Sequence, residues 1–236
     1  MTRRGEADRG PLERRARALL NQAGRSLTRL ERHAARAVAA AAESVIASLE
    51  AGGTIYFCGN GGSAADAQHM ACELAGRFVL ERPGLAAVAL TTNTSSLTAI
   101  GNDYGFDQVF ARQLEGLGVP GDVLVAITTS GGSPNVLAAV HAARRLGMTV
   151  IGMTGLKGGR FAALCDHALV TPSVSTPRIQ EGHIAMGHTL CELVERRMFP
   201  ARRKRARARG ESAVRRSRTT SRPRGTRARP HRAGRS

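Results

Sequence analysis

Residues 54–69 read TIYFCGNGGSAADAQH, which is a short apolar run, a polar loop with three glycines, and the start of a helical pattern. An apolar run of this length is typical of a buried strand. The glycines permit positive φ and close backbone approach, and Ser63 is placed to cap the helix that follows. Free amides at a helix start favour an anionic or polyhydroxylated ligand, so the loop is a candidate binding site. A purely structural turn would have a similar sequence.

The same alternation of strand and helix continues along the chain. Strands are expected at residues 54–59, 86–90, 122–128, 149–154 and 167–172, and helices at about 63–78, 106–117, 134–146 and 178–199. Apolar positions at helical spacing over residues 12–50 predict one long N-terminal helix ahead of them. Apolar strands that alternate with helices imply an α/β fold with a parallel five-stranded sheet flanked by helices. In such folds ligands bind beyond the carboxyl ends of the strands.

The charge is distributed unevenly and divides the chain into three parts. An N-terminal helical segment (1–50) and an α/β domain (51–200) precede a tail (201–236). The tail contains 15 of the 35 Lys and Arg residues and one of the 18 acidic residues, a net charge of +14, which leaves +3 for residues 1–200. Because it has almost no large apolar residue, we expect a disordered Arg-rich tail. It either binds nucleic acid or another polyanion or is a dispensable extension, and the rest of the chain shows no such footprint.

Composition and spacing also exclude several classes of protein. The sequence has no signal-peptide pattern and no apolar run of about 18 residues, so we expect a cytoplasmic protein without a membrane partner. Trp is absent and Tyr occurs twice, too few aromatic rings for a single-strand nucleic-acid reader. The loop at residues 59–63 matches neither a P-loop nor a dinucleotide-binding turn, and we expect no nucleotide cofactor.

A second polar loop, TTSGGSP (128–134), follows the third long strand. It carries four hydroxyl groups, and Ser133 followed by Pro134 is a favourable helix start. Hydroxyls and free helix amides together can bind a phosphate dianion without a cation. An ordinary Ser/Thr-rich turn is the alternative, but two such loops in one sheet favour a ligand.

Two helices present polar side chains on one face. His69, Glu73 and Arg77 follow each other at intervals of four residues, and Gln180 and His188 are eight apart on the last helix. Surface ladders explain these patterns as well. Nitrogen and oxygen donors of this kind suit a divalent metal, and the candidate set is His69, Glu73, Gln180 and His188. Whether these four meet is not decided by the sequence.

Four stretches together resemble the phosphoheptose isomerases, the sedoheptulose 7-phosphate isomerase branch of the sugar-isomerase (SIS) domain superfamily. They are CGNGGSAADAQHMACELAGRF (58–78), GNDYGFDQVF (101–110), TTSGGSPNV (128–136), and RIQEGH (178–183) followed by GH (187–188). The resemblance covers about residues 12–198 and excludes the tail. It implies a SIS-type sheet in a homotetramer whose active sites lie between subunits. The activity it implies is conversion of sedoheptulose 7-phosphate to D-glycero-D-manno-heptose 7-phosphate, the first step of nucleotide-activated heptose biosynthesis.

The resemblance also implies roles for individual residues. Substrate contacts would come from Asn60, Gly61, Gly62, Ser63, Glu73, Asn102, Asp103 and Gln180, with the phosphate on Thr128, Thr129, Ser130 and Ser133. Glu73 would be the general base and His188 the acid of a proton transfer through an enediolate. Some members bind zinc through the positions that match His69, Glu73, Gln180 and His188, which implies one Zn²⁺ per subunit.

Two positions depart from the family pattern, and one relative suggests another function. Thr128 replaces the usual Ser, and Thr176-Pro177 occupies a site where some members have Asp. The main alternative is a non-catalytic SIS protein that associates with the DnaA replication initiator, but that paralogue lacks the catalytic Glu and His. Glu73 and His188 are both present in this sequence, which favours the enzyme. A sugar-phosphate-sensing regulator is a weaker alternative, because its usual helix-turn-helix domain is not recognisable.

Overall fold

The computed structural model describes residues 10–200, and the predicted tail at 201–236 lies outside the described residues. Five parallel strands form one sheet in the order β2-β1-β3-β4-β5. The strands are β1 (Ile55–Gly59), β2 (Ala87–Ala89), β3 (Val123–Ile127), β4 (Thr149–Gly155) and β5 (His167–Thr171). Each predicted strand is therefore present, with both ends within one residue of the expected position.

The helices agree with the sequence in most places. They are α1 (Pro11–Glu50), α2 (Gly62–Ala75), α3 (Thr94–Tyr104), η1 (Phe106–Gln108, a 3₁₀ turn), α4 (Ala111–Leu117), α5 (Pro134–Arg145), α6 (Gly159–Ala162) and α7 (Thr176–Met198). Two helices were not predicted, α3 and the short α6. Helix α2 ends at Ala75 rather than near 78, and the expected helix 106–117 is divided into η1 and α4.

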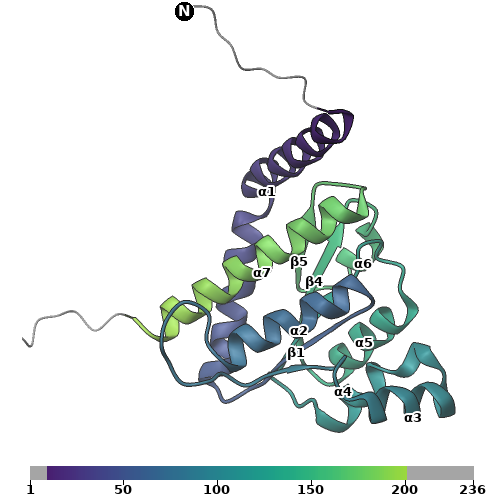
Figure 1. Cartoon of the computed structure of the whole chain (residues 1–236). Helices are drawn as coiled ribbons and strands as arrows, with labels where there is room; N and C mark the ends of the chain where they lie inside the picture. Colours follow the sequence, from purple (N-terminus) through teal and green to yellow (C-terminus); the bar gives the residue numbers. More distant parts are fainter. Residues whose placement is uncertain (1–9, 201–236) are drawn as a thin grey trace, which may run out of the picture. The chain divides into compact units, whose positions relative to one another are not determined.

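Helices cover both faces of the sheet (Figure 1), and alternate residues of β1, β3 and β4 belong to two separate apolar clusters, one on each face. Phe57 and Val125 pack with α1, α2 and α7, whereas Tyr56 and Leu124 pack with α4, α5 and α6 on the other face. Burying a side chain such as Phe57 completely contributes about 1.5–3 kcal/mol. The strands are nearly continuous apolar runs because both faces of the sheet are covered.

The helices that follow the neighbouring strands β1 and β3 pack on opposite faces of the sheet. From β1 the chain runs into α2 on one face, and from β3 it runs into α5 on the other. The polar loops at residues 60–61 and 128–133 therefore leave adjacent strand ends in opposite directions, the position at which folds of this kind bind ligands.

The long helix α1 packs along α7 and β5, as Figure 1 shows. Its inward face includes Leu30, Ala34, Val38 and Val45, which are buried. Among residues 10–200, no helix combines the length and apolar character that crossing a bilayer requires.

Candidate functional site

The first loop is connected to the second by a pair of side-chain amides. Asn60 Nδ2 donates to Asn135 Oδ1, and Asn135 Nδ2 donates to Asn60 Oδ1, both at 2.8 Å. Asn135 is buried in the first turn of α5, so this pair connects the helices that follow β1 and β3. Asn135 was not predicted as a site residue, although its position directly after the second polar loop could have indicated a role there. Asn60, which is predicted to contact the substrate, is therefore held in place by hydrogen bonds from both the oxygen and the nitrogen of its side-chain amide.

Helix α2 begins at a glycine and not at the predicted serine cap. Gly61 occupies the N-cap position with φ of 55°, a left-handed conformation that favours glycine. Ser63 lies inside the first turn and is buried, and no side chain caps the helix. The prediction that Ser63 caps α2 was wrong, because Gly61 turns the chain two residues earlier. The Ser63 and Ala64 amides donate to the Asn60 and Gly61 carbonyls, so within residues 10–200 the amides at this helix start that have no backbone acceptor are those of Gly61 and Gly62.

Gln180 of α7 lies against the start of α2. A Cβ added to Gly62 would clash with the Gln180 side-chain amide, which would then have to move away. The contact brings two predicted substrate residues together.

The second loop is braced by its own hydroxyl groups. Thr128 is buried, and its Oγ1 lies 3.1 Å from Ser133 Oγ and accepts a hydrogen bond from the Gly131 amide at 3.2 Å. Ser133 occupies the N-cap position of α5 ahead of Pro134, as predicted, but its side chain does not bond to the helix amides. Thr128 therefore shapes the loop from inside, while Ser130 is exposed to solvent.

A small polar pocket of about 130 Å³ adjoins this loop. It is lined by Thr129 and Ser130, by Lys157 from the turn after β4, and by Val174, Thr176 and Ile179 at the start of α7. Lys157 adds an ammonium group to the predicted phosphate loop. Sequence reasoning missed it because Lys157 lies in a different turn, more than 20 residues further along the chain.

His69 lies between Glu73, the predicted base, and His188, the predicted acid. His69 Nε2 lies 3.2 Å from Glu73 Oε1, one turn along α2, and 2.9 Å from His188 Nε2 on α7. A hydrogen bond between two imidazole nitrogens requires one ring to donate and the other to accept, and the tautomers decide which does so. The side chain of Glu73 is 23% exposed, which leaves it accessible to a ligand.

A further carboxylate, Asp66, lies beside the same histidines, and the sequence analysis did not identify it. Burial raises the pKa of Asp66, and the charges of His69 and His188 partly oppose that rise. Its Oδ2 atom is buried and has no hydrogen-bond partner within the described part of the chain. Asp66 precedes His69 by three residues on α2, and this spacing could have predicted that the two side chains lie on one face of the helix.

Asn102 and Asp103, which are also predicted to contact the substrate, lie on helix α3 and not on α2, α7 or the two polar loops. Asn102 and Asp103 form the last turn of α3 rather than a turn between elements, and both are exposed. Asn102 Nδ2 donates to Asp103 Oδ1 at 2.8 Å. Within residues 10–200, no hydrogen bond joins either side chain to the two polar loops.

The four predicted metal ligands do not converge within this chain. His69 contacts Glu73 and His188, but Gln180 lies against Gly62, about two turns of α2 away. In the described residues, no group of three or more His, Cys, Asp or Glu is arranged to hold a metal ion. The donor types suit zinc, but this conformation does not form a four-ligand centre.

Comparisons with known proteins agree with this arrangement. The SIS domain family model matches residues 19–155. A phosphoheptose isomerase from Rhodospirillum rubrum is 62% identical over 161 residues, which are 68% of this chain and 86% of the relative. The solved phosphoheptose isomerase of Neisseria gonorrhoeae is 48% identical with a TM-score of 0.74, covering 78% of this chain and 98% of that one. The structure from Francisella tularensis is 38% identical with a TM-score of 0.76, covering 80% and 100%.

The family match covers the first part of the site, and Lys157, Gln180 and His188 lie beyond it. The matched region contains both polar loops, as well as His69 and Glu73. The chain therefore belongs to the SIS-domain phosphoheptose isomerases.

Proposed function

We propose that this protein is an aldose–ketose isomerase that converts sedoheptulose 7-phosphate to D-glycero-D-manno-heptose 7-phosphate. Relatives named phosphoheptose isomerase at 62% and 56% identity support this activity. The observation that carries the proposal is the meeting of Glu73, His69 and His188 where α2 and α7 pack together. A non-catalytic DnaA-associated protein gains no support from these relatives or from this intact site.

The proposed reaction moves one proton between adjacent carbons. Glu73 removes a proton from C1 of the ketose and returns it to C2 through an enediolate, which a carboxylate near the two carbons can do. His188 exchanges protons with the O1 and O2 atoms. The His69–His188 contact supports this role, because it positions the His188 imidazole, which can donate or accept a proton, beside the residue that contacts the base.

The phosphate group would occupy the second loop. The Thr129 and Ser130 hydroxyls line the pocket that also receives Lys157, so a dianion would meet both hydrogen-bond donors and a positive charge. The start of α2 at Gly61 and Gly62 would bind sugar hydroxyls through free amides. In this proposal the phosphate contacts the second loop and the reacting carbons contact side chains of α2 and α7.

Zinc is a further part of the proposal: one ion per subunit would be held by His69, Glu73, Gln180 and His188 once the Gln180 side chain moves from Gly62 towards His69. A bound zinc ion would polarise the carbonyl and stabilise the enediolate. Elemental analysis of purified protein, with and without a chelator, tests this. We expect zinc near one equivalent in the native protein and a loss of zinc in Gln180→Ala. Full activity in metal-free protein would contradict the requirement.

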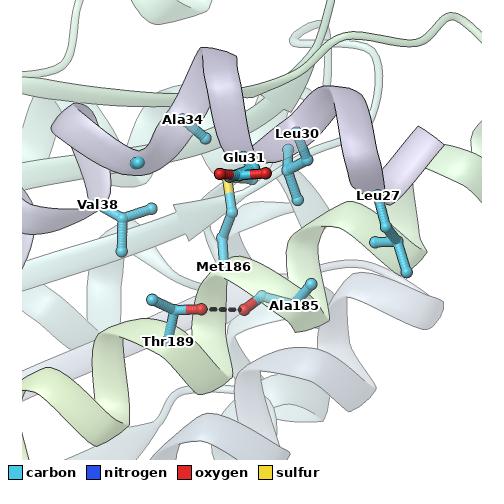
Figure 2. Close-up of a pocket in the computed structure, with 9 residues that line it drawn as sticks. Leu27, Leu30, Glu31, Ala34, Val38, Ala185, Met186 and Thr189 are labelled. Carbon is cyan, nitrogen blue, oxygen red and sulfur yellow. Dashed lines mark hydrogen bonds between the residues drawn. The ribbon is translucent and has the colours of Figure 1, made fainter. Parts of the chain in front are cut away.

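Assembly as a homotetramer is proposed from the apolar surface of α1 and α7. A groove of about 310 Å³ is lined by residues of both helices, and Figure 2 shows Leu27, Leu30 and Val38 of α1 facing Met186 of α7. Leu20 on α1 is 73% exposed. Light scattering should therefore give a tetramer mass, and Leu20→Arg should shift the mass downward, while Leu117→Arg on α4 should not.

The activity is tested by turnover of purified protein. We expect sedoheptulose 7-phosphate to be converted to the aldose phosphate. Unphosphorylated sedoheptulose should react far less well, because it has no phosphate group to bind to the second loop. Absence of conversion, or equal rates for the two sugars, would refute the proposal.

A further inference from the structure

A buried ion pair lies directly behind the proposed acid and base. Arg82, from the loop between α2 and β2, and Glu195, near the end of α7, join at 3.0 Å between Nε and Oε1. Their side chains are 1% and 0% exposed. Charged groups are rarely buried this completely unless their remaining hydrogen bonds are satisfied.

Glu195 binds the backbone of the loop that follows α2. Oε1 accepts from the Phe78 amide at 3.0 Å, and Oε2 accepts from the Val79 and Leu80 amides, each at 2.8 Å. Burial alone would raise the pKa of Glu195, but these amides and Arg82 outweigh it and hold the pKa below its usual value. Glu195 therefore remains an anion to which the loop is attached.

Arg82 caps the C-terminal end of α2. Its Nη2 donates to the backbone carbonyl of Glu73 at 2.8 Å. Its Nη1 donates to the carbonyls of Leu74, Gly76 and Pro83 at 2.7, 3.2 and 3.0 Å. The last carbonyls of a helix have no partner within the helix, so Arg82 satisfies groups that would otherwise be orphaned.

The loop held by this pair also contacts His188. The Phe78 ring lies 5.4 Å from the His188 ring between centroids, and the Phe78 amide is one of those bound by Glu195. His188 and Glu195 are seven residues apart and therefore share one face of α7. Arg82 thus holds the backbone of the base, and Glu195 holds the loop that packs on the acid.

We propose that Arg82 and Glu195 are positioning residues that set the separation of Glu73 and His188. Neither side chain reaches solvent, so neither touches substrate, and both act through the backbone and Phe78. Misplacing a catalytic group by about 1 Å can cost about 100-fold in rate. The pair is remote from the two polar loops, which lie at the opposite end of α2. This inference rests on the proposed isomerase activity.

The test compares kcat with KM in a variant that retains the charge. Arg82→Lys keeps a cation beside Glu195 but loses the planar fork that reaches the Glu73 carbonyl. We expect kcat to fall about 10–100-fold while KM stays within about twofold, because the substrate loops are untouched. Arg145→Lys is the matched control, since Arg145 forms an exposed ion pair with Glu115 at 3.0 Å. The control should keep both parameters.

A second variant decides the matter if Arg82→Lys does not fold. Phe78→Leu leaves the ion pair intact and removes only the ring beside His188, so it should fold and still lower kcat. Unchanged kcat in a folded Arg82→Lys or Phe78→Leu protein, or a loss confined to KM, would overturn the proposal. Inactive wild-type protein would refute the isomerase activity instead. In that case a crystal structure of Arg82→Lys still tests positioning, and unmoved Glu73 and His188 side chains would overturn it.

Discussion

Replacing Glu73 by Gln should abolish turnover while leaving the fold intact. Gln has the same volume as Glu and can still hydrogen-bond to His69, whose Nε2 lies 3.2 Å from the carboxylate. It has no charge with which to accept a proton. Loss of a general base alone costs about 10²–10⁴-fold in rate, and we expect kcat to fall within that range.

The effect of Glu73→Gln on stability should be small. His69 and Glu73 form an i,i+4 pair with side chains 45% and 23% exposed, and such pairs contribute about 0.2–0.5 kcal/mol. That corresponds to a change of less than about 2 °C in Tm for a chain of this size. The loss of activity therefore cannot be attributed to unfolding.

The assay follows formation of the aldose phosphate by purified wild-type and variant proteins under saturating substrate. Glu81→Gln is a matched control, because it makes the same change in charge at a side chain that is 92% exposed on the loop after α2. The control should have wild-type kcat. A Glu73→Gln protein with a rate within about threefold of wild type would refute the assignment of the base, since general-base loss costs at least about 100-fold.

Three further predictions concern the phosphate, a buried histidine and the tail. Ser130→Ala and Lys157→Gln should each raise KM about tenfold with a smaller change in kcat, because a hydrogen bond to a charged group contributes about 1.5–3 kcal/mol; unchanged KM values would place the phosphate elsewhere. Burial lowers the pKa of His183 from 6.5 to about 4, so the unfolded chain takes up a proton that the folded chain excludes, and stability should be complete above pH 6.5 and fall towards pH 4. Denaturant unfolding should show a loss of about 3 kcal/mol over that window, reduced in His183→Leu. Deletion of residues 201–236 should leave kcat unchanged and abolish any salt-sensitive binding to DNA or heparin, because that segment carries +14.

The sheet could be predicted well from the sequence because its signal is local. Each strand is a short apolar run bounded by turn residues, and the burial of both faces leaves no ambiguity in the pattern. Helix α3 was missed for the opposite reason. Its segment TSSLTAIGNDY is rich in Ser and Thr, has no buried residue, and is stabilised by the Asn93 side chain, which accepts from the Ser96 amide at 3.0 Å. No apolar periodicity marks such a helix.

Contacts within the site were only partly predictable, because they join segments far apart in the sequence. Spacing placed His69 and Glu73 on one face of α2, and the structure confirms this. Spacing could not show that Gln180 lies against Gly62 while His188 lies beside His69, because that depends on how α2 and α7 pack. The end of α2 at Ala75 depends in the same way on Arg82, which caps the helix from the following loop.

Isomerisation in D₂O tests the proposed proton transfer most directly. The account predicts that the aldose phosphate formed from sedoheptulose 7-phosphate carries deuterium at C2, because the proton taken up by the partly exposed Glu73 exchanges with solvent before it is returned. Nuclear magnetic resonance of the product measures this directly. Complete conversion to an aldose with no deuterium at C2 would mean a direct hydride shift or a base closed to solvent, and either would contradict proton transfer through a partly exposed Glu73.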